Sequence, residues 1–211
     1  MLLAIGLACA FAGIFLCPAA AELAQPPEAL LSTAEHSRNV YDAARSSYWA
    51  RANSGLRALT TAGARLVRSP ADREAKWLAK KLVQLACAVY ERDRLKTMRA
   101  ANRITFWAAQ QAVSYQLSTP TAVTLLEFYG REVQIAMEAG DPNELAKSVA
   151  NLRQGWKAAR PMIALRNVAA PLEKFDALIE RLENPSPGDE PASLTDVMLK
   201  SVDDMEKLFP E

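Results

Sequence analysis

One short stretch, Ala139-Gly140-Asp141-Pro142-Asn143-Glu144, ends one helix and begins the next within six residues. Glycine directly after a helix stops it, because glycine adopts the left-handed conformation without a steric penalty. Asp141 before a proline starts a helix, since its carboxylate caps free backbone amides and proline fits the first turn, and Glu144 completes a capping box. The sequence therefore predicts a tight antiparallel helical hairpin, and the rest of the chain has to fold around it.

Apolar residues in the first half of the chain recur at steps of three and four, which is the spacing of one helix face. They predict one long helix over residues 33–68. After a Ser32 or Thr33 cap its apolar seam is expected to follow Tyr41, Ala44, Tyr48, Ala52, Leu56, Leu59, Gly63 and Leu66. Ser69 is expected to cap a second helical stretch, residues 70–117, with Asp72 at its third position. Because one rod of that length would reach about 70 Å, we expect a bend or break within residues 91–102, although the sequence does not fix the helix boundaries between residues 91 and 119.

Further helices are predicted in the second half. Residues 118–120 predict the start of the helix that Gly140 ends, and Pro161 is expected to end or kink the helix after the hairpin. Residues 171–183 predict another helix, and the proline-rich residues 184–191 predict a loop. A final helix is then expected from its cap and apolar face: Ser193 or Thr195, with Leu194, Val197, Met198, Val202, Met205, Leu208 and Phe209.

No segment alternates apolar and polar residues as a strand does, and no period of 20 to 50 residues repeats. The sequence predicts an all-α fold, an antiparallel helical bundle of four or more helices, some long, with a C-terminal helix after a proline-rich loop. We expect residues 22–32, which contain Pro26-Pro27, to form an N-terminal arm. Residues 33–211 are expected to form a single helical-bundle domain.

Residues 2–21 are apolar and contain no charged side chain. Pro18 and the following Ala19-Ala20-Ala21 match the end of a signal peptide, so residues 1–21 are interpreted as a signal peptide and the protein as periplasmic or secreted. The Lys or Arg that usually precedes such a run is missing. An uncleaved membrane anchor over residues 2–21 is the main alternative, since a run of that length can span a bilayer. A lipid attached at Cys17 is a third interpretation.

The two halves of the remaining chain carry opposite charge. Residues 22–118 contain 15 basic and 8 acidic side chains, and residues 119–211 contain 10 basic and 16 acidic ones. One interpretation is that the halves pack together and compensate each other. The other is that the Arg-rich N-terminal half faces a protein partner or an anionic envelope surface. Nucleic acid is not expected as a partner, because the arginines of the first helix do not share one face and export removes that target.

The residue patterns of common enzymes are missing from the sequence. His36 is its only histidine, and it contains no nucleophile elbow, phosphate loop or dinucleotide fingerprint. Without Glu-x-x-His or a cysteine cluster we expect no metal site, no cofactor and no catalytic residue. Cys87 is the one cysteine after the leader, and the flanking Leu85 and Val89 predict an inert thiol in the core.

Four glycines are expected inside helices, at Gly55, Gly63, Gly130 and Gly155, although each costs about 0.5 to 1 kcal/mol relative to Ala. Four tryptophans lie on separate stretches, at Trp49, Trp77, Trp107 and Trp156. We expect the indole rings to pack over the glycines of neighbouring helices, which would offset that cost. The alternative is that the glycines open a ligand cavity lined by Trp and Tyr.

The candidate ligand-binding residues are Glu127, Tyr129, Arg131 and Trp156. Glu127 and Arg131 lie one helical turn apart and are expected to form a solvated pair, while a buried Arg131 beside Tyr129 would hold an anion. We expect an exported, non-enzymatic bundle that acts as a protein- or envelope-interaction module, with a homo-oligomer left open. The alternative is a periplasmic carrier of a small ligand or metal ion in a cavity between the helices.

Overall fold

The computed structural model describes residues 24–67, 72–186 and 191–209. Within them the chain forms α-helices and no strand, which confirms the predicted all-α class. These helices are α1 (Glu28–Arg45), α2 (Trp49–Leu66), α3 (Arg73–Tyr90), α4 (Arg94–Ala112), α5 (Thr121–Ala139), α6 (Pro142–Ala164), α7 (Ala170–Glu183) and α8 (Pro191–Glu206). None of these described helices is long and apolar enough to cross a membrane. The predicted signal peptide, residues 1–21, lies outside the described residues.

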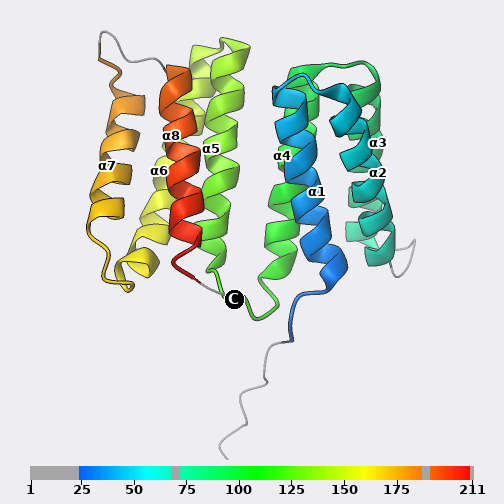
Figure 1. Ribbon diagram of the computed structural model, residues 1–211, viewed down its shortest axis with the longest axis horizontal. Coiled ribbons are helices and arrows are strands. Elements are labelled where there is room, and N and C mark those ends of the chain that lie inside the picture. The colour runs from blue at the N-terminus through cyan, green and yellow to red at the C-terminus, as the bar shows by residue number, and fades with distance from the viewer. Residues whose placement is uncertain (1–23, 68–71, 187–190, 210–211) are drawn as a thin grey trace, which may run out of the picture.

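The helices form two antiparallel groups of four that stand side by side (Figure 1). In the N-terminal bundle, α1 to α4, each helix packs against the next and α4 returns to α1. In the C-terminal bundle, α5 to α8, the order is the same and α8 returns to α5. The two bundles meet where α4 packs against α5. The sequence predicted an antiparallel bundle, and its division into two rings of four is a feature of the tertiary structure.

Each bundle has its own apolar core. The fully buried side chains of the N-terminal core include Leu59, Leu78, Leu85, Met98 and Ile104. Those of the C-terminal core include Leu126, Leu152, Ile163, Phe175 and Met198. Ile135 joins the two, because it belongs to α5 and packs into the N-terminal core. That residues 33–211 form one domain stays a prediction.

The prediction of one helix over residues 33–68 was wrong, because the chain turns between α1 and α2. Ser47 has a φ of 55°, and the backbone amide of Tyr48 donates to the Ala43 carbonyl, five residues back. This is the hydrogen-bond pattern that commonly ends helices at a left-handed glycine, here formed by a serine. Tyr48, expected in the apolar seam, is consequently 61% exposed.

The break expected within residues 91–102 is confirmed at residues 91–93. Arg92 has a φ of 53°, and the Asp93 amide donates to the Ala88 carbonyl, which repeats the turn at Ser47. Asp93 then caps α4 by accepting a hydrogen bond from the Lys96 amide at 3.0 Å. The cap of α3 is Asp72, which accepts from the Glu74 amide at 3.0 Å, and not Ser69, which lies outside the described residues.

Several predicted helix ends differ by a few residues. The arm over residues 22–32 is shorter than expected, since α1 already starts at Glu28, and Leu30 is 4% exposed in the core. No side chain of residues 118–120 caps α5 by a hydrogen bond. The helix carrying Pro161 continues to Ala164, so the proline does not end it there. The last helix begins at Pro191, before the two residues that were expected to cap it.

The predicted hairpin at Gly140 is confirmed. Gly140 ends α5 in the left-handed conformation with φ 68°, and the Asp141 carboxylate caps α6 by accepting from the amides of Asn143 and Glu144. The Glu144 side chain, however, does not close a capping box. It pairs with Arg99 of α4 and so ties the two bundles together.

The expectation that tryptophans cover the helical glycines was wrong. A methyl group at Gly155 would meet the Tyr129 ring, and one at Gly55 would meet Val40. At Gly130 the neighbours are Met198 and Leu199 of α8. The glycines do admit large side chains of neighbouring helices, as small-to-large packing requires. The large partners are aliphatic side chains and one tyrosine.

Candidate functional site

A charged groove of about 500 Å³ lies between α1, α5 and α8 at the junction of the bundles, and we call it the inter-bundle groove. Two predicted site residues, Glu127 and Arg131, line it. Its other charged lining residues are Glu35, Arg38, Asp42, Arg45, Asp196, Lys200, Asp203 and Glu206. The groove thus brings basic side chains of the N-terminal bundle against acidic ones of α8.

Glu127 and Arg131 form a buried pair, contrary to the expectation of a solvated one. The Arg131 guanidinium lies 2.9 Å from the Glu127 carboxylate and 3.3 Å from that of Asp42. It also lies 4.4 Å from the centre of the Tyr41 ring, within the range of a cation–π contact. Arg38 Nε lies 2.6 Å from Glu127 Oε2, as an ion pair rather than a directed hydrogen bond. The carboxylates of Glu127 and Asp42 therefore balance the positive charge of Arg131, and no bound anion is needed for this.

Tyr129 and Trp156, the other two predicted site residues, do not line the inter-bundle groove. The Tyr129 ring packs over Gly155 of α6 and contacts Phe128 edge-on. The Trp156 indole is 3% exposed and donates a hydrogen bond to Asp176 of α7 at 2.6 Å. The structure thus brings Glu127 and Arg131 together and separates Tyr129 and Trp156 from them.

Carboxyl groups in the inter-bundle groove have raised pKa values. Burial raises the pKa of Glu206 to about 7, against the attraction of Arg38, and Glu127 adds to the increase. Burial also raises the pKa of Asp203 and of Asp42, and Arg131 partly offsets both. Within the described residues no three His, Cys, Asp or Glu side chains gather so that they could hold a metal ion.

Arginines of α1 and α4 pair with acids of the C-terminal half. Arg45 lies 2.6 Å from Asp196, and Arg94 lies 3.1 Å from Glu138. Together with the pairs Arg38–Glu127 and Arg99–Glu144, these contacts link the two bundles electrostatically. They confirm that the opposite charges of the two halves partly compensate each other.

A second set of basic residues, on α2 and α3, takes no part in these ion pairs. These helices contain seven basic residues and one acid, Glu74. Six of the basic side chains are exposed, and none of the six forms an ion pair with a described residue. Figure 1 places α2 and α3 on the side of the N-terminal bundle away from α5–α8. We call this set the α2–α3 basic face: Arg51, Arg57, Arg65, Arg73, Lys76 and Lys80.

The basic residues of α3 continue into an exposed apolar row. Val83, Cys87 and Tyr90 follow Lys80 at steps of three and four, so they lie along the same side of the helix. Val83 is 64% exposed and Tyr90 is 88% exposed. Cys87 is exposed as well, which overturns its assignment to the core. Its neighbours Leu85 and Val89 are buried, but they lie on the opposite side of the helix.

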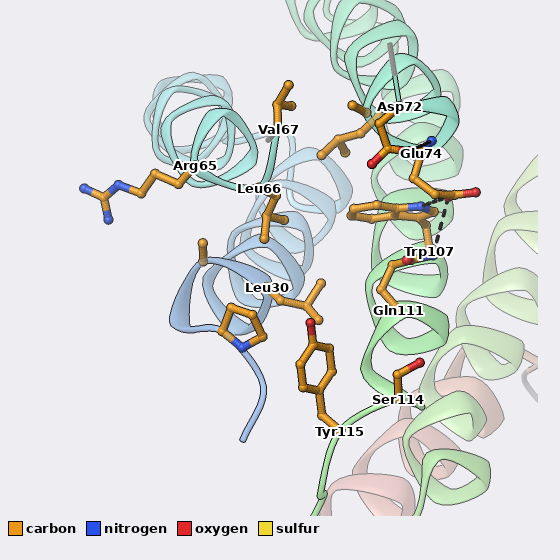
Figure 2. Close-up of a pocket in the computed structure, with 14 residues that line it drawn as sticks. Leu30, Arg65, Leu66, Val67, Asp72, Glu74, Trp107, Gln111, Ser114 and Tyr115 are labelled. Atoms are coloured by element: carbon orange, nitrogen blue, oxygen red, sulfur yellow. Dashed lines mark hydrogen bonds between the residues drawn. The ribbon is translucent and has the colours of Figure 1, made fainter. Parts of the chain in front are cut away.

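A cavity of about 290 Å³ opens at one end of the N-terminal bundle, and we call it the bundle-end cavity (Figure 2). The first residues of α1 and α3 and the last residues of α2 and α4 form its wall. Leu30, Leu66 and Leu78 supply apolar surface, and Trp107 and Tyr115 supply aromatic surface. It is not the cavity opened by glycines that the sequence suggested as an alternative, because Gly55, Gly63, Gly130 and Gly155 do not line it.

Polar groups converge on one side of the bundle-end cavity. The Glu74 carboxylate accepts a hydrogen bond from the Trp107 indole at 2.7 Å and a longer one from the Gln111 amide at 3.4 Å. Both bonds go to Oε2, so Oε1 keeps its capacity to accept. This group was not predictable from the sequence, because Glu74 and Trp107 are 33 residues apart and belong to no known motif.

Comparison of the chain with protein-family models, curated proteins and solved structures finds no significant match. The function therefore has to be inferred from surface and cavity chemistry. Two features offer such chemistry outside the ion pairs that join the bundles, namely the α2–α3 basic face and the bundle-end cavity.

Proposed function

We propose that the protein binds an anionic lipid surface through the α2–α3 basic face. The observation that carries this proposal is the set of six exposed basic side chains without ion-pair partners among the described residues. Each Lys or Arg near an anionic bilayer contributes about 1 kcal/mol to binding. The arginines that neutralise the C-terminal half belong to α1 and α4, so lipid binding would not compete with the contacts between the bundles.

The exposed row on α3 favours a lipid layer over an acidic protein as the partner. Val83 and Tyr90 extend the row that begins with Arg73, Lys76 and Lys80, so one helix presents cationic and apolar groups to the same side. Tyrosine is enriched at the level of lipid headgroups, and mixed basic and apolar helix faces bind there. Export, which residues 2–21 predict, would bring this face to the lipids of the cell envelope.

Vesicle co-sedimentation tests the proposal. The protein should bind vesicles that contain phosphatidylglycerol and should not bind vesicles of phosphatidylcholine alone. Added salt should weaken binding, since exposed charges are screened. The double variant Lys76→Glu/Lys80→Glu should lower affinity by roughly 30-fold or more, because two favourable charges are lost and reversed.

Lys147→Glu/Lys157→Glu is the matched control, because both lysines are exposed on α6 of the other bundle and the change in net charge is the same. It should reduce binding by much less. Equal binding to charged and uncharged vesicles, or equal weakening by the two double variants, would reject the proposal. Binding to an acidic protein without any binding to vesicles would reject it too.

A further inference from the structure

The bundle-end cavity has the size and wall of a small-ligand site. Its volume of about 290 Å³ lies at the lower end of the range of such sites, about 300 to 1,000 Å³. Leu78 is 1% exposed and Trp107 is 8% exposed, so the inner part of the wall is core surface that is already rigid. All four helices of the bundle contribute to it, which makes the cavity a property of the folded bundle.

The charge of the cavity is set by carboxylates. Glu74 and Asp72 both line it, and Asp72 caps α3 through Oδ1. The Trp107 indole holds the Glu74 carboxylate at Oε2, and in Figure 2 its other oxygen points away from the apolar lining residues. Arg65 also lines the cavity, but Figure 2 shows its side chain pointing away from the other lining residues. Among the described lining residues, two carboxylates therefore stand against one guanidinium, so these residues give the cavity a net negative charge.

The aromatic rings favour the same charge in a ligand. The Trp107 indole lies beside Glu74, and its nitrogen is held by the carboxylate. In Figure 2 the Tyr115 ring extends from the end of α4 with its hydroxyl directed toward the cavity. Trp77 stacks on the Trp107 indole, which leaves one indole face to attract a cation, and the Tyr115 hydroxyl can accept a hydrogen bond. A carboxylate strengthens hydrogen bonds from a protonated amine.

We propose that the bundle-end cavity binds a small organic cation, a protonated amine with an apolar body. The amine would lie near the Glu74 carboxylate at the Trp107 indole, and the apolar body would lie against Leu30, Leu66 and Leu78. This site adjoins the α2–α3 basic face at Arg65, and the proposal does not depend on lipid binding.

Titration calorimetry of the full chain with three probes of similar shape tests this. Phenethylamine should bind about tenfold more tightly than the uncharged 2-phenylethanol, and 3-phenylpropionate should bind least. Glu74→Gln should reduce the affinity for phenethylamine to that for the alcohol. Asp176→Asn, which alters the equivalent Trp–carboxylate contact in the C-terminal bundle, should leave all three affinities unchanged.

Ser114→Trp is a second variant that tests the cavity even if the Glu74 variant fails to fold. Ser114 is an exposed residue of the cavity wall, so a large ring there should block every probe while thermal unfolding stays cooperative. The proposal is overturned if the alcohol binds as tightly as the amine, or if no probe binds at millimolar concentration. It is overturned as well if Ser114→Trp leaves phenethylamine binding unchanged.

Discussion

Arg131 and Glu127 form an ion pair of 2.9 Å across one turn of α5, and the two side chains are 6% and 10% exposed. A pair so far from water has lost the hydration of both charges, and only close contacts with other groups compensate that loss. Asp42 and the Tyr41 ring supply such contacts for Arg131, and Arg38 supplies one for Glu127. The pair joins α5 to α1 and thereby helps to set how the two bundles meet.

Replacing Arg131 by Met should lower the free energy of unfolding by about 3 kcal/mol, because a buried carboxylate loses a partner. Urea denaturation measures this. Arg153→Met is the control, since the Arg153–Glu183 pair is exposed and should contribute less than about 1 kcal/mol. Arg131→Met/Glu127→Met should recover much of the loss. Equal costs for the two single variants would show that the pair on α5 is not buried in solution.

Replacing Gly155 by Ala should destabilise the C-terminal bundle. The added methyl group would lie 2.5 Å from a carbon of the Tyr129 ring, so the ring has to move. We expect a net loss of about 1 to 2 kcal/mol, since overpacking outweighs the better helix propensity of Ala. A double variant with Tyr129→Ala should cost less than the sum of the single changes.

Gly63→Ala is the comparison for this packing experiment. Its methyl group would lie 3.2 Å from the end of the Leu82 side chain, which can shift. The free energy of unfolding should change by less than about 1 kcal/mol. Equal free energies of unfolding for Gly155→Ala and Gly63→Ala would contradict the close approach of α5 and α6 at Tyr129.

Because of Glu206, the free energy of unfolding should decrease as pH rises. Its pKa of about 7 in the folded protein lies above the ordinary value of 4.5, so the folded state holds a proton that the unfolded state releases between these values. The free energy of unfolding therefore falls through this window. Glu206→Gln should raise it by about 1 kcal/mol at about pH 8, allowing for partial exposure, and leave it unchanged at about pH 4.

Urea denaturation of both proteins across this pH range measures the effect. Glu180→Gln serves as the reference, because Glu180 is exposed on α7. A gain from Glu206→Gln that is the same at low and high pH would contradict a raised pKa.

Cys87 should react with a thiol reagent in the native protein, because its side chain is exposed. Labelling without denaturant should show a fast-reacting thiol that Cys87→Ser removes. The same substitution should change the free energy of unfolding by no more than about 0.5 kcal/mol, as is usual at a surface position. Slow labelling that requires unfolding would show that the Cys87 side chain is buried in solution, contrary to this prediction.

The candidate sites show the limits of local patterns. The spacing of Glu127 and Arg131 predicted that they would pair, but their burial depends on α1 and α8, which lie far away in the sequence. The bundle-end cavity was not predictable, since its wall combines the ends of four helices and Glu74 meets Trp107 only in the folded bundle. Tyr129 and Trp156 were grouped with Arg131 by residue type, and packing places them elsewhere.

The sequence alone determined the helical class and the hairpin at Gly140-Asp141-Pro142, because glycine, aspartate and proline act on the backbone within a few residues. Tertiary structure decided the turns at Ser47 and Arg92, where no glycine marks a left-handed residue. At such positions the strain is about 1 to 2 kcal/mol, and burying two apolar helix faces against each other offsets it. That gain depends on partners distant in the chain, so no local stretch could predict how the eight described helices pack into two bundles.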